Sequence, residues 1–356
     1  MHPASQAVPH SVEYPTREVP VPGTCVEIAP GIWWLRMQLP FALNHINLWL
    51  LEDGDGWTIV DTGLGDDATR AHWEQVFAAR LGGRPVRRVV VTHYHPDHAG
   101  NAGWLCRKFG VGLWMTQGEY LSAHAVRDLK AGYGVDATLA LYAANGVGGE
   151  RYAAMTTRGN VYAAQVTELP VSFRQLIDGD CLRIGRYDWR VIVGYGHAPE
   201  HASLYCGETN TLISGDMLLP KISTNVSVWS IEPMGNPLKR FLDSIERYRE
   251  LPADVLVLPS HGLPFRGAHA RVAELAAHHD ARFAELEAAC AGGARSASEL
   301  LEVIFPRKLD VHQMFFAMGE AMAHLHWLHE AGRMTREVGA DGVTRFRSTA
   351  RARAVA

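Results

Sequence analysis

The sequence has few cysteines, and none of them lies in a paired motif. Its 356 residues include five, an odd number, with no CxxC or zinc-finger spacing. This pattern excludes a disulfide framework and favours ordinary buried thiols in a reducing cytoplasm. The five are Cys25, Cys106, Cys181, Cys206 and Cys290.

Long apolar runs are also missing. No stretch approaches the roughly 18 apolar residues that a membrane-spanning helix needs, and residues 1–20 lack the basic start and apolar core of a secretory signal. We therefore expect a soluble, cytoplasmic protein with no membrane partner. A composition of 47% hydrophobic and 20% charged residues agrees with a soluble enzyme. The partner that we expect is a small-molecule substrate.

The chain lacks a sustained basic block before its C-terminal tail, and its net charge is −4. Both features argue against a nucleic-acid partner, although an acidic protein can still carry a local basic patch. The absence of a GxSxG motif excludes the nucleophile elbow of the serine hydrolases.

What the sequence does contain is a dense cluster of metal-binding residue types in "VVVTHYHPDHAGN", residues 89–101. The three valines predict a strand that is buried on both faces. His93 and His95 alternate and point the same way on an extended segment, whereas Asp97 and His98 follow a proline that bends the chain. One turn can therefore present two pairs of ligands to two adjacent points. Imidazoles with a carboxylate suit zinc, iron or manganese better than calcium or magnesium.

Three later strand ends supply further candidate ligands. "WRVIVGYGHAPEHASLY" leads into His197, "NTLISGDMLL" ends at Asp216, and "ADVLVLPSHGLPF" ends at His261. In each, an apolar strand is followed by glycine, proline or serine and a polar residue. More ligands are needed because four groups on one turn cannot complete two coordination shells.

On these motifs the chain resembles the metallo-β-lactamase fold superfamily, and "TIVDTG" at 58–63 is similar to the first motif of that family. The resemblance implies one metal held by His93, His95 and His197. It implies a second metal held by Asp97, His98 and His261. It also implies that Asp216 bridges both metals and that Asp61 orients ligands from behind.

The fold that the resemblance implies is α/β, an αββα sandwich with the metals at the strand ends along one edge. The expected cofactors are two divalent transition-metal ions, zinc foremost, with iron or manganese as alternatives. A hydroxide bridging the two metals would attack the substrate, and Asp97 would be catalytic by helping to move its proton.

Two regions extend beyond a plain sandwich. We expect residues 1–270 to form the catalytic domain, with a helical pair inserted at about 118–176 over the site. The lid candidates are Tyr120, His124, Tyr142 and Tyr152.

In residues 271–356 the sequence predicts three helices and a hairpin around Asp341-Gly342. This module resembles a winged-helix extension found in the lactamase-like protein 2 branch of the family. Its very apolar helix at 311–331 suits a wall of the active site or a homodimer contact better than a DNA-reading surface.

The substrate is the least determined point, because one fold hosts several hydrolytic reactions. We expect an acyl thioester, ester or lactone, since the segments around the metal edge are mostly apolar. The alternative is a nuclease acting on single-stranded RNA. Three residues are candidates for binding the substrate: Glu200, Lys221 and Trp229.

Overall fold

The computed structural model describes residues 12–157 and 159–349. The outer ends of both predicted domains, 1–11 and 350–356, lie outside the described residues. Most of residues 1–20, in which we expected no secretory signal, therefore also lies outside them. None of the described helices is long and apolar enough to cross a membrane.

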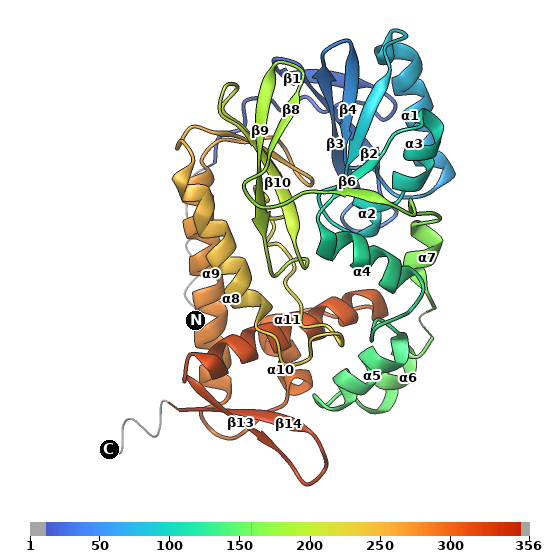
Figure 1. Ribbon diagram of the computed structural model, residues 1–356. Coiled ribbons are helices and arrows are strands. Elements are labelled where there is room, and N and C mark those ends of the chain that lie inside the picture. Colours follow the sequence, from blue (N-terminus) through green and yellow to red (C-terminus); the bar gives the residue numbers. More distant parts are fainter. Residues whose placement is uncertain (1–11, 158, 350–356) are drawn as a thin grey trace.

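Two sheets within the described residues form the centre of the fold (Figure 1). The larger has seven strands, of which β1 to β4 are antiparallel and β4 to β7 are parallel. Its strands are β1 (Cys25–Ala29), β2 (Ile32–Gln38), β3 (His45–Asp53), β4 (Gly56–Val60), β5 (Val86–Val90), β6 (Leu113–Met115) and β7 (Phe173–Gln175). The smaller has the order β12-β11-β10-β9-β8, and only its β11–β12 pair is parallel. Its strands are β8 (Cys181–Ile184), β9 (Tyr187–Gly194), β10 (His201–Cys206), β11 (Thr211–Gly215) and β12 (Leu256–Pro259).

Successive side chains along a strand point to opposite faces of its sheet, and this alternation explains why the two sheets pack against each other. In β5, Val90 faces a core that lies between the two sheets, whereas Val89 faces the core on the outer side of the larger sheet. Both side chains are fully buried, as expected for a strand covered on both faces.

Helices cover the outer face of each sheet, so the predicted αββα sandwich is confirmed (Figure 1). The larger sheet is covered by α1 (Asp67–Val76), with its continuation Phe77–Leu81, and by α3 (Ala102–Phe109). The smaller sheet is covered by α8 (Pro237–Glu246), followed by the short turn Arg247–Glu250, and by α9 (Ala268–Ala289). Asp66 begins α1 by accepting a hydrogen bond from the Thr69 N–H at 2.7 Å.

In its described residues the insertion between β6 and β7 contains four helices, so the prediction of a helical pair was wrong. They are α4 (Gln117–Arg127), α5 (Val135–Ala143), α6 (Gly149–Met155) and α7 (Val161–Gln165). The second helix of the expected pair is broken between α5 and α6, where Gly146 has φ +92°, a left-handed conformation that a helix interior does not allow.

The C-terminal part contains the expected three helices and hairpin. They are α9, α10 (Ala297–Ile304), α11 (Val311–Glu330), β13 (Met334–Val338) and β14 (Thr344–Ser348). Its likeness to a winged helix stays a prediction. α9 crosses the boundary expected near residue 270, and one hydrophobic core combines side chains from α8, α9, α11 and the insertion. Within the described residues the two parts therefore share their packing.

Candidate metal centre

The loops that leave four strands meet at one edge of the sandwich. β5 leads to His93 and His95, and the short helix α2 (Pro96–Ala99) then carries Asp97 and His98. The loops after β9, β11 and β12 contribute the remaining side chains. The structure brings all seven candidates into two groups in which the potential ligand atoms lie within 4.8 Å of one another: His93, His95, His197 and Asp216; and Asp97, His98 and His261.

In the first group, ring nitrogens converge on one point. The His93 Nε2 atom lies 2.9 Å from His95 Nδ1 and 3.1 Å from His197 Nε2. Asp216 approaches from the side, with its Oδ2 atom 3.5 Å from His197 Nε2. Three imidazoles and a carboxylate oxygen at these separations are a suitable ligand set for one transition-metal ion.

The second group uses the other oxygen of the same aspartate. Asp216 Oδ1 lies 3.4 Å from the Nε2 atoms of both His98 and His261. Asp97 Oδ2 lies 3.4 Å from His261 Nε2 and 3.8 Å from His98 Nε2. Asp216 thus presents one oxygen to each group.

Two atoms at the centre of the second group have surroundings that suit a cation. His98 Nε2 and Asp216 Oδ1 are buried and have no hydrogen-bond partner among the described residues. Buried polar atoms without partners cost folding free energy, so native structures rarely retain them without a ligand or ion. The residues present therefore fit a metal ion at this position.

Outer hydrogen bonds orient three of the imidazoles. The Nδ1 atom of His98 lies 2.8 Å from Asp61 Oδ2, that of His197 lies 2.8 Å from the Asn225 carbonyl, and that of His261 lies 2.8 Å from the His45 carbonyl. Each acceptor favours the proton on Nδ1 and leaves Nε2 free to bind metal. Asp61 thus lies behind the ligands, as the resemblance implies.

The electrostatics differ between the two groups. Burial lowers the pKa of His95 to about 3, and the nearby His197 adds to this effect. Burial also opposes protonation of His261, but Asp216 and Asp97 outweigh it and raise the pKa of His261 to about 10. Burial would raise the pKa of Asp216, yet His261 and His98 hold it well below its usual range. The first group is therefore neutral imidazole, the state that binds a metal, and the carboxylates remain charged.

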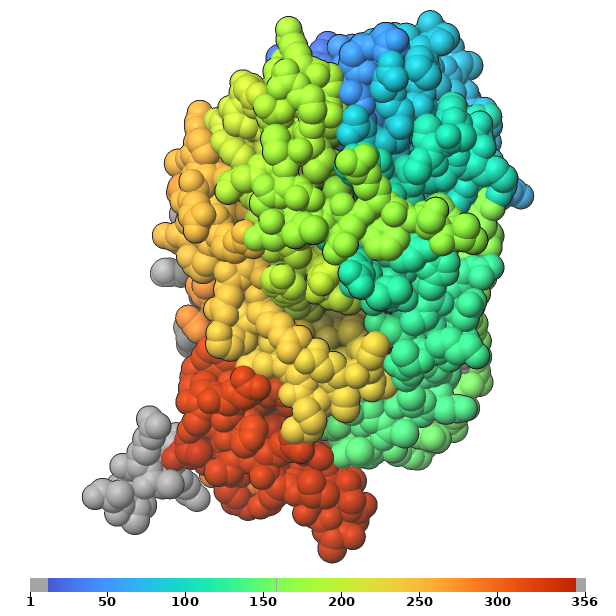
Figure 2. Space-filling view, viewed as in Figure 1, coloured from blue at the N-terminus to red at the C-terminus, as the bar shows by residue number. Residues whose placement is uncertain are grey.

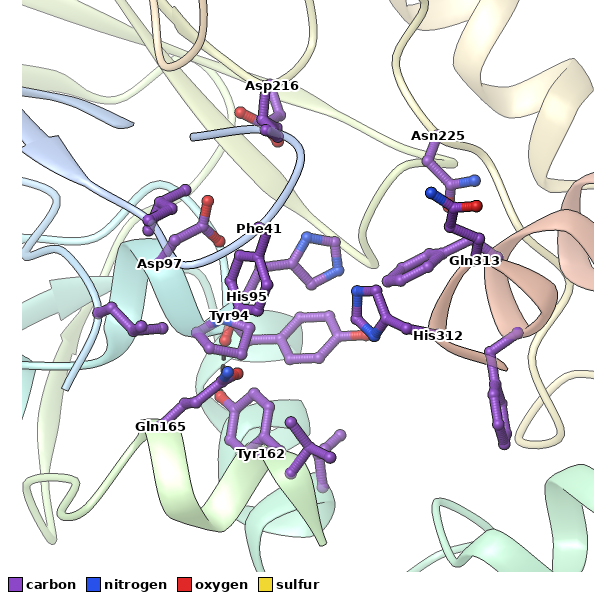
Figure 3. A pocket seen from close by; sticks show the side chains of 18 of the residues that line it. Phe41, Tyr94, His95, Asp97, Tyr162, Gln165, Asp216, Asn225, His312 and Gln313 are labelled. Carbon is purple, nitrogen blue, oxygen red and sulfur yellow. Dashed lines mark hydrogen bonds between the residues drawn. The ribbon is translucent and has the colours of Figure 1, made fainter. Parts of the chain in front are cut away.

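A cavity of about 880 Å³ opens from the metal-binding groups. Figure 3 shows His95 and Asp97 on one side, facing His312 and Gln313 of α11 across the space. The insertion and the loop after β11 form further walls. The space-filling view is hollowed between the yellow segment after β11 and the green insertion (Figure 2).

Most of the wall is apolar. Two aromatic pairs contribute to it: Phe41 stacks on His312 with ring centroids 5.7 Å apart, and Trp229 meets Phe316 edge to face at 6.3 Å. Among the described residues that line the cavity, none is lysine or arginine. The cavity therefore suits an uncharged, largely apolar ligand.

Of the three residues predicted to contact the substrate, one is among the described residues that line the cavity. Trp229 lines the cavity, whereas Glu200 and Lys221 are not among its described lining residues. The Glu200 carboxylate instead accepts a hydrogen bond from the Gly118 N–H at 2.6 Å, in the first turn of α4. Glu200 thus caps a helix of the insertion, a choice that the sequence alone left open.

The predicted lid residues were wrong. None of Tyr120, His124, Tyr142 and Tyr152 lines the described part of the cavity. Tyr142 is fully buried, and its hydroxyl donates to the Phe315 carbonyl at 2.7 Å. The insertion does lie over the site, but Tyr133 and Tyr162 are the tyrosines that it contributes.

Apart from Asp61, sequence reasoning missed the outer partners of the metal-binding groups. His201 Nε2 accepts a hydrogen bond from the Asp216 N–H at 3.1 Å, and His45 and Asn225 act through backbone carbonyls. His201 could have been found as the second histidine of "GHAPEH". A backbone carbonyl leaves no side-chain signal in the sequence.

Comparison with known proteins agrees with this geometry. The model described as "Metallo-beta-lactamase superfamily" matches residues 43–261, and "Metallo-beta-lactamase-like, C-terminal domain" matches residues 283–349. The crystal structure of a beta-lactamase domain protein from Burkholderia ambifaria is 47% identical, with a TM-score of 0.88, and the match covers 96% of this chain and 99% of that one.

Two curated relatives are more distant. "Probable metallo-hydrolase YqjP" of Bacillus subtilis (strain 168) is 25% identical over 297 residues, which is 82% of this chain and 90% of the relative. "Atrochrysone carboxyl ACP thioesterase" of Aspergillus fumigatus is 22% identical over 290 residues, 77% of this chain and 73% of the relative.

Proposed function

Because the chain belongs to the metallo-beta-lactamase superfamily, we propose that it is a two-metal hydrolase of uncharged acyl thioesters, with esters and lactones as related substrates. One observation carries the proposal: both metal-binding groups lie at one end of a mostly apolar cavity that has no lysine or arginine among its described lining residues. A metal site joined to such a cavity suits an acyl group whose carbonyl reaches the metals and whose chain lies against the walls.

The metals would be divalent transition-metal ions, zinc foremost, with iron or manganese as alternatives. His93, His95 and His197 would hold one, Asp97, His98 and His261 the other, and Asp216 would serve both. When bound, they would supply Lewis-acid polarisation of the carbonyl and a water of lowered pKa.

We propose that Asp97 is the catalytic residue. It lines the cavity and lies against His261, with 3.4 Å between Asp97 Oδ2 and His261 Nε2. From this position its carboxylate would orient the attacking water and accept its proton, so a separate general base is not required.

The cavity walls would bind the acyl chain and exclude bulk water from the carbonyl. Transfer of each methylene from water to an apolar wall stabilises binding by about 0.8 kcal/mol, which is a factor of about 4 in affinity. Trp229 and Phe316 offer such a wall on the α11 side, and Phe41 offers one from the loop between β2 and β3.

A thioester is favoured over the other acyl substrates because one relative is named as a thioesterase for an acyl group on a carrier protein. Phosphodiester cleavage is disfavoured because a nucleic acid needs several cations along its track. The described cavity wall instead includes a further carboxylate, that of Asp310.

The test is a substrate panel with metal-loaded protein. Acyl thioesters from acetyl to decanoyl, a matched ester and lactone series, and single-stranded RNA would be assayed on one preparation. The proposal expects thioester turnover that rises with chain length and disappears in Asp97→Ala. RNA cleavage that depends on Asp97, with no acyl turnover at any length, would contradict it.

A further inference from the structure

We propose that Glu320 of α11 is a positioning residue for His197 and acts by holding Asn225. The inference rests on the proposed function, because it takes His197 to be a metal ligand. It gives the C-terminal helix a direct part in shaping the metal centre, in addition to forming a wall of the cavity.

The contacts run from the ligand to the helix in two steps. His197 Nδ1 lies 2.8 Å from the carbonyl oxygen of Asn225, to which it donates its proton. The side-chain amide of Asn225 then donates to the Glu320 carboxylate at 3.1 Å. A single residue therefore separates the imidazole of a candidate metal ligand from α11.

The loop that contains Asn225 is held closely against the same helix. The Ser227 hydroxyl lies 2.8 Å from Asn225 Oδ1, and the Val228 N–H donates to the Gly319 carbonyl at 3.0 Å. A Cβ atom added at Gly319 would lie only 2.6 Å from the Cβ of Ser227. Position 319 therefore lets the loop approach the helix backbone, and the neighbouring Glu320 can reach the Asn225 amide.

The chemical role follows from what the Asn225 carbonyl does. An acceptor on Nδ1 selects the tautomer with Nε2 free and fixes the plane of the ring. If Asn225 loses its anchor on α11, its carbonyl can move and His197 Nε2 is held less firmly toward His93 and Asp216. The expected consequence is weaker binding of the metal that His197 would hold.

Glu330 provides a matched control on the same helix. Its carboxylate also accepts a hydrogen bond from an asparagine amide, that of Asn236, at 2.8 Å. Asn236 begins α8 and accepts a hydrogen bond from the Lys239 N–H. Glu320 and Glu330 therefore make the same kind of contact between α11 and the catalytic part, but only the Glu320 contact leads to a candidate ligand.

The experiment compares full-length wild type with Glu320→Ala, Glu320→Gln and Glu330→Ala. Affinity for zinc is measured by competition with a chromophoric chelator, and the cobalt-substituted proteins are compared by their absorption spectra. For Glu320→Ala we expect a loss of about 10-fold in affinity for one metal, the lower end of the effect of outer-partner substitutions, together with an altered cobalt spectrum. Glu320→Gln keeps an acceptor for the Asn225 amide and should bind near the wild-type level, as should Glu330→Ala.

Asn225→Ala covers the case in which Glu320→Ala does not fold, because it keeps the backbone carbonyl but removes the amide. It should lose at least as much affinity as Glu320→Ala, because it also removes the acceptor of the Ser227 hydroxyl. Adding Glu320→Ala to Asn225→Ala should cause no further loss, since Glu320 acts through the Asn225 amide. Wild-type metal affinity and spectra in Glu320→Ala or Asn225→Ala, or an equal loss in Glu330→Ala, would overturn the inference alone. A wild-type protein that binds no transition metal would overturn the proposed function and this inference with it.

Discussion

Asp61→Asn should weaken the metal centre, because the Asp61 side chain holds His98 in its orientation. The Asp61 carboxylate is fully buried and accepts three hydrogen bonds. Its Oδ1 accepts from the Thr92 N–H at 2.8 Å, and its Oδ2 accepts from the Thr92 hydroxyl at 2.9 Å and from His98 Nδ1 at 2.8 Å. These contacts place the His98 proton on Nδ1 and direct Nε2 toward Asp216.

Asparagine keeps the shape of this site but replaces one oxygen with an amino group. It also tolerates the backbone of position 61, where φ is +61°. If the amino group faces His98, that ring must carry its proton on Nε2 and can no longer offer this atom to a metal. If it faces the Thr92 N–H, two donors oppose each other in a buried site, which costs about 1–3 kcal/mol.

We therefore expect Asp61→Asn to weaken binding of the second metal by about 10–100-fold, or about 1.4–2.7 kcal/mol. Chelator competition measures the affinity, and urea unfolding of the metal-free protein measures the stability. Asp53→Asn is the control, because Asp53 is also buried and accepts hydrogen bonds from Thr58, Arg88 and Gly185 at the opposite end of β4. It should lose stability but keep metal affinity. Wild-type affinity for both metals in Asp61→Asn would refute the reasoning.

Three further expectations follow. Asp97→Ala should abolish turnover and bind one metal ion fewer than wild type by elemental analysis, and retained turnover would contradict the catalytic role. Trp229→Ala should lower kcat/KM for a decanoyl thioester by about 10-fold, from about 1.5 kcal/mol of lost apolar contact, and leave the acetyl thioester nearly unchanged; an equal effect on both would contradict a chain-binding wall. Burial lowers the pKa of His279 to about 3 and of His324 to about 4, so the unfolded chain, with histidine pKa values near 6.5, binds protons first as the pH falls. Their contribution to the free energy of unfolding is fully present above about pH 6.5 and decreases below it by about 1.4 kcal/mol per pH unit for each histidine. When the free energy of unfolding is measured with urea from pH 7 to 5, it should therefore decrease less steeply in His279→Leu than in wild type.

The metal-binding groups could be anticipated from the sequence because each candidate ligand directly follows an apolar strand. Parallel pairing of β4 with β5 and of β11 with β12 brings such strand ends to one edge. Spacing within a turn is a local property, so "HYHPDH" carries most of the information that the folded site needs. Outside the insertion, the order of helices and strands could be predicted from equally local signals, namely alternation in the strands and glycine at their ends.

The sequence predicted that helix 311–331 could form a wall of the active site, but most of the side chains that line the cavity could not be anticipated, because the walls are assembled from distant segments. Phe41 and His312 stack although they are 271 positions apart in the sequence (312 − 41). Helical periodicity in the insertion did not reveal which face meets α11, and for this reason Tyr142 was predicted in the lid but packs against Phe315. Glu200 was ambiguous because the helix that it caps begins more than 80 positions earlier, at Gln117.

The dependence of kcat/KM on acyl chain length in metal-loaded wild-type protein tests the central claim most directly. If the apolar cavity binds the acyl group while the metal-binding groups act on its carbonyl, kcat/KM for thioesters should rise by up to about 4-fold per methylene until the cavity is filled. A flat series, or the absence of turnover at every length while the metals are bound, would contradict the account.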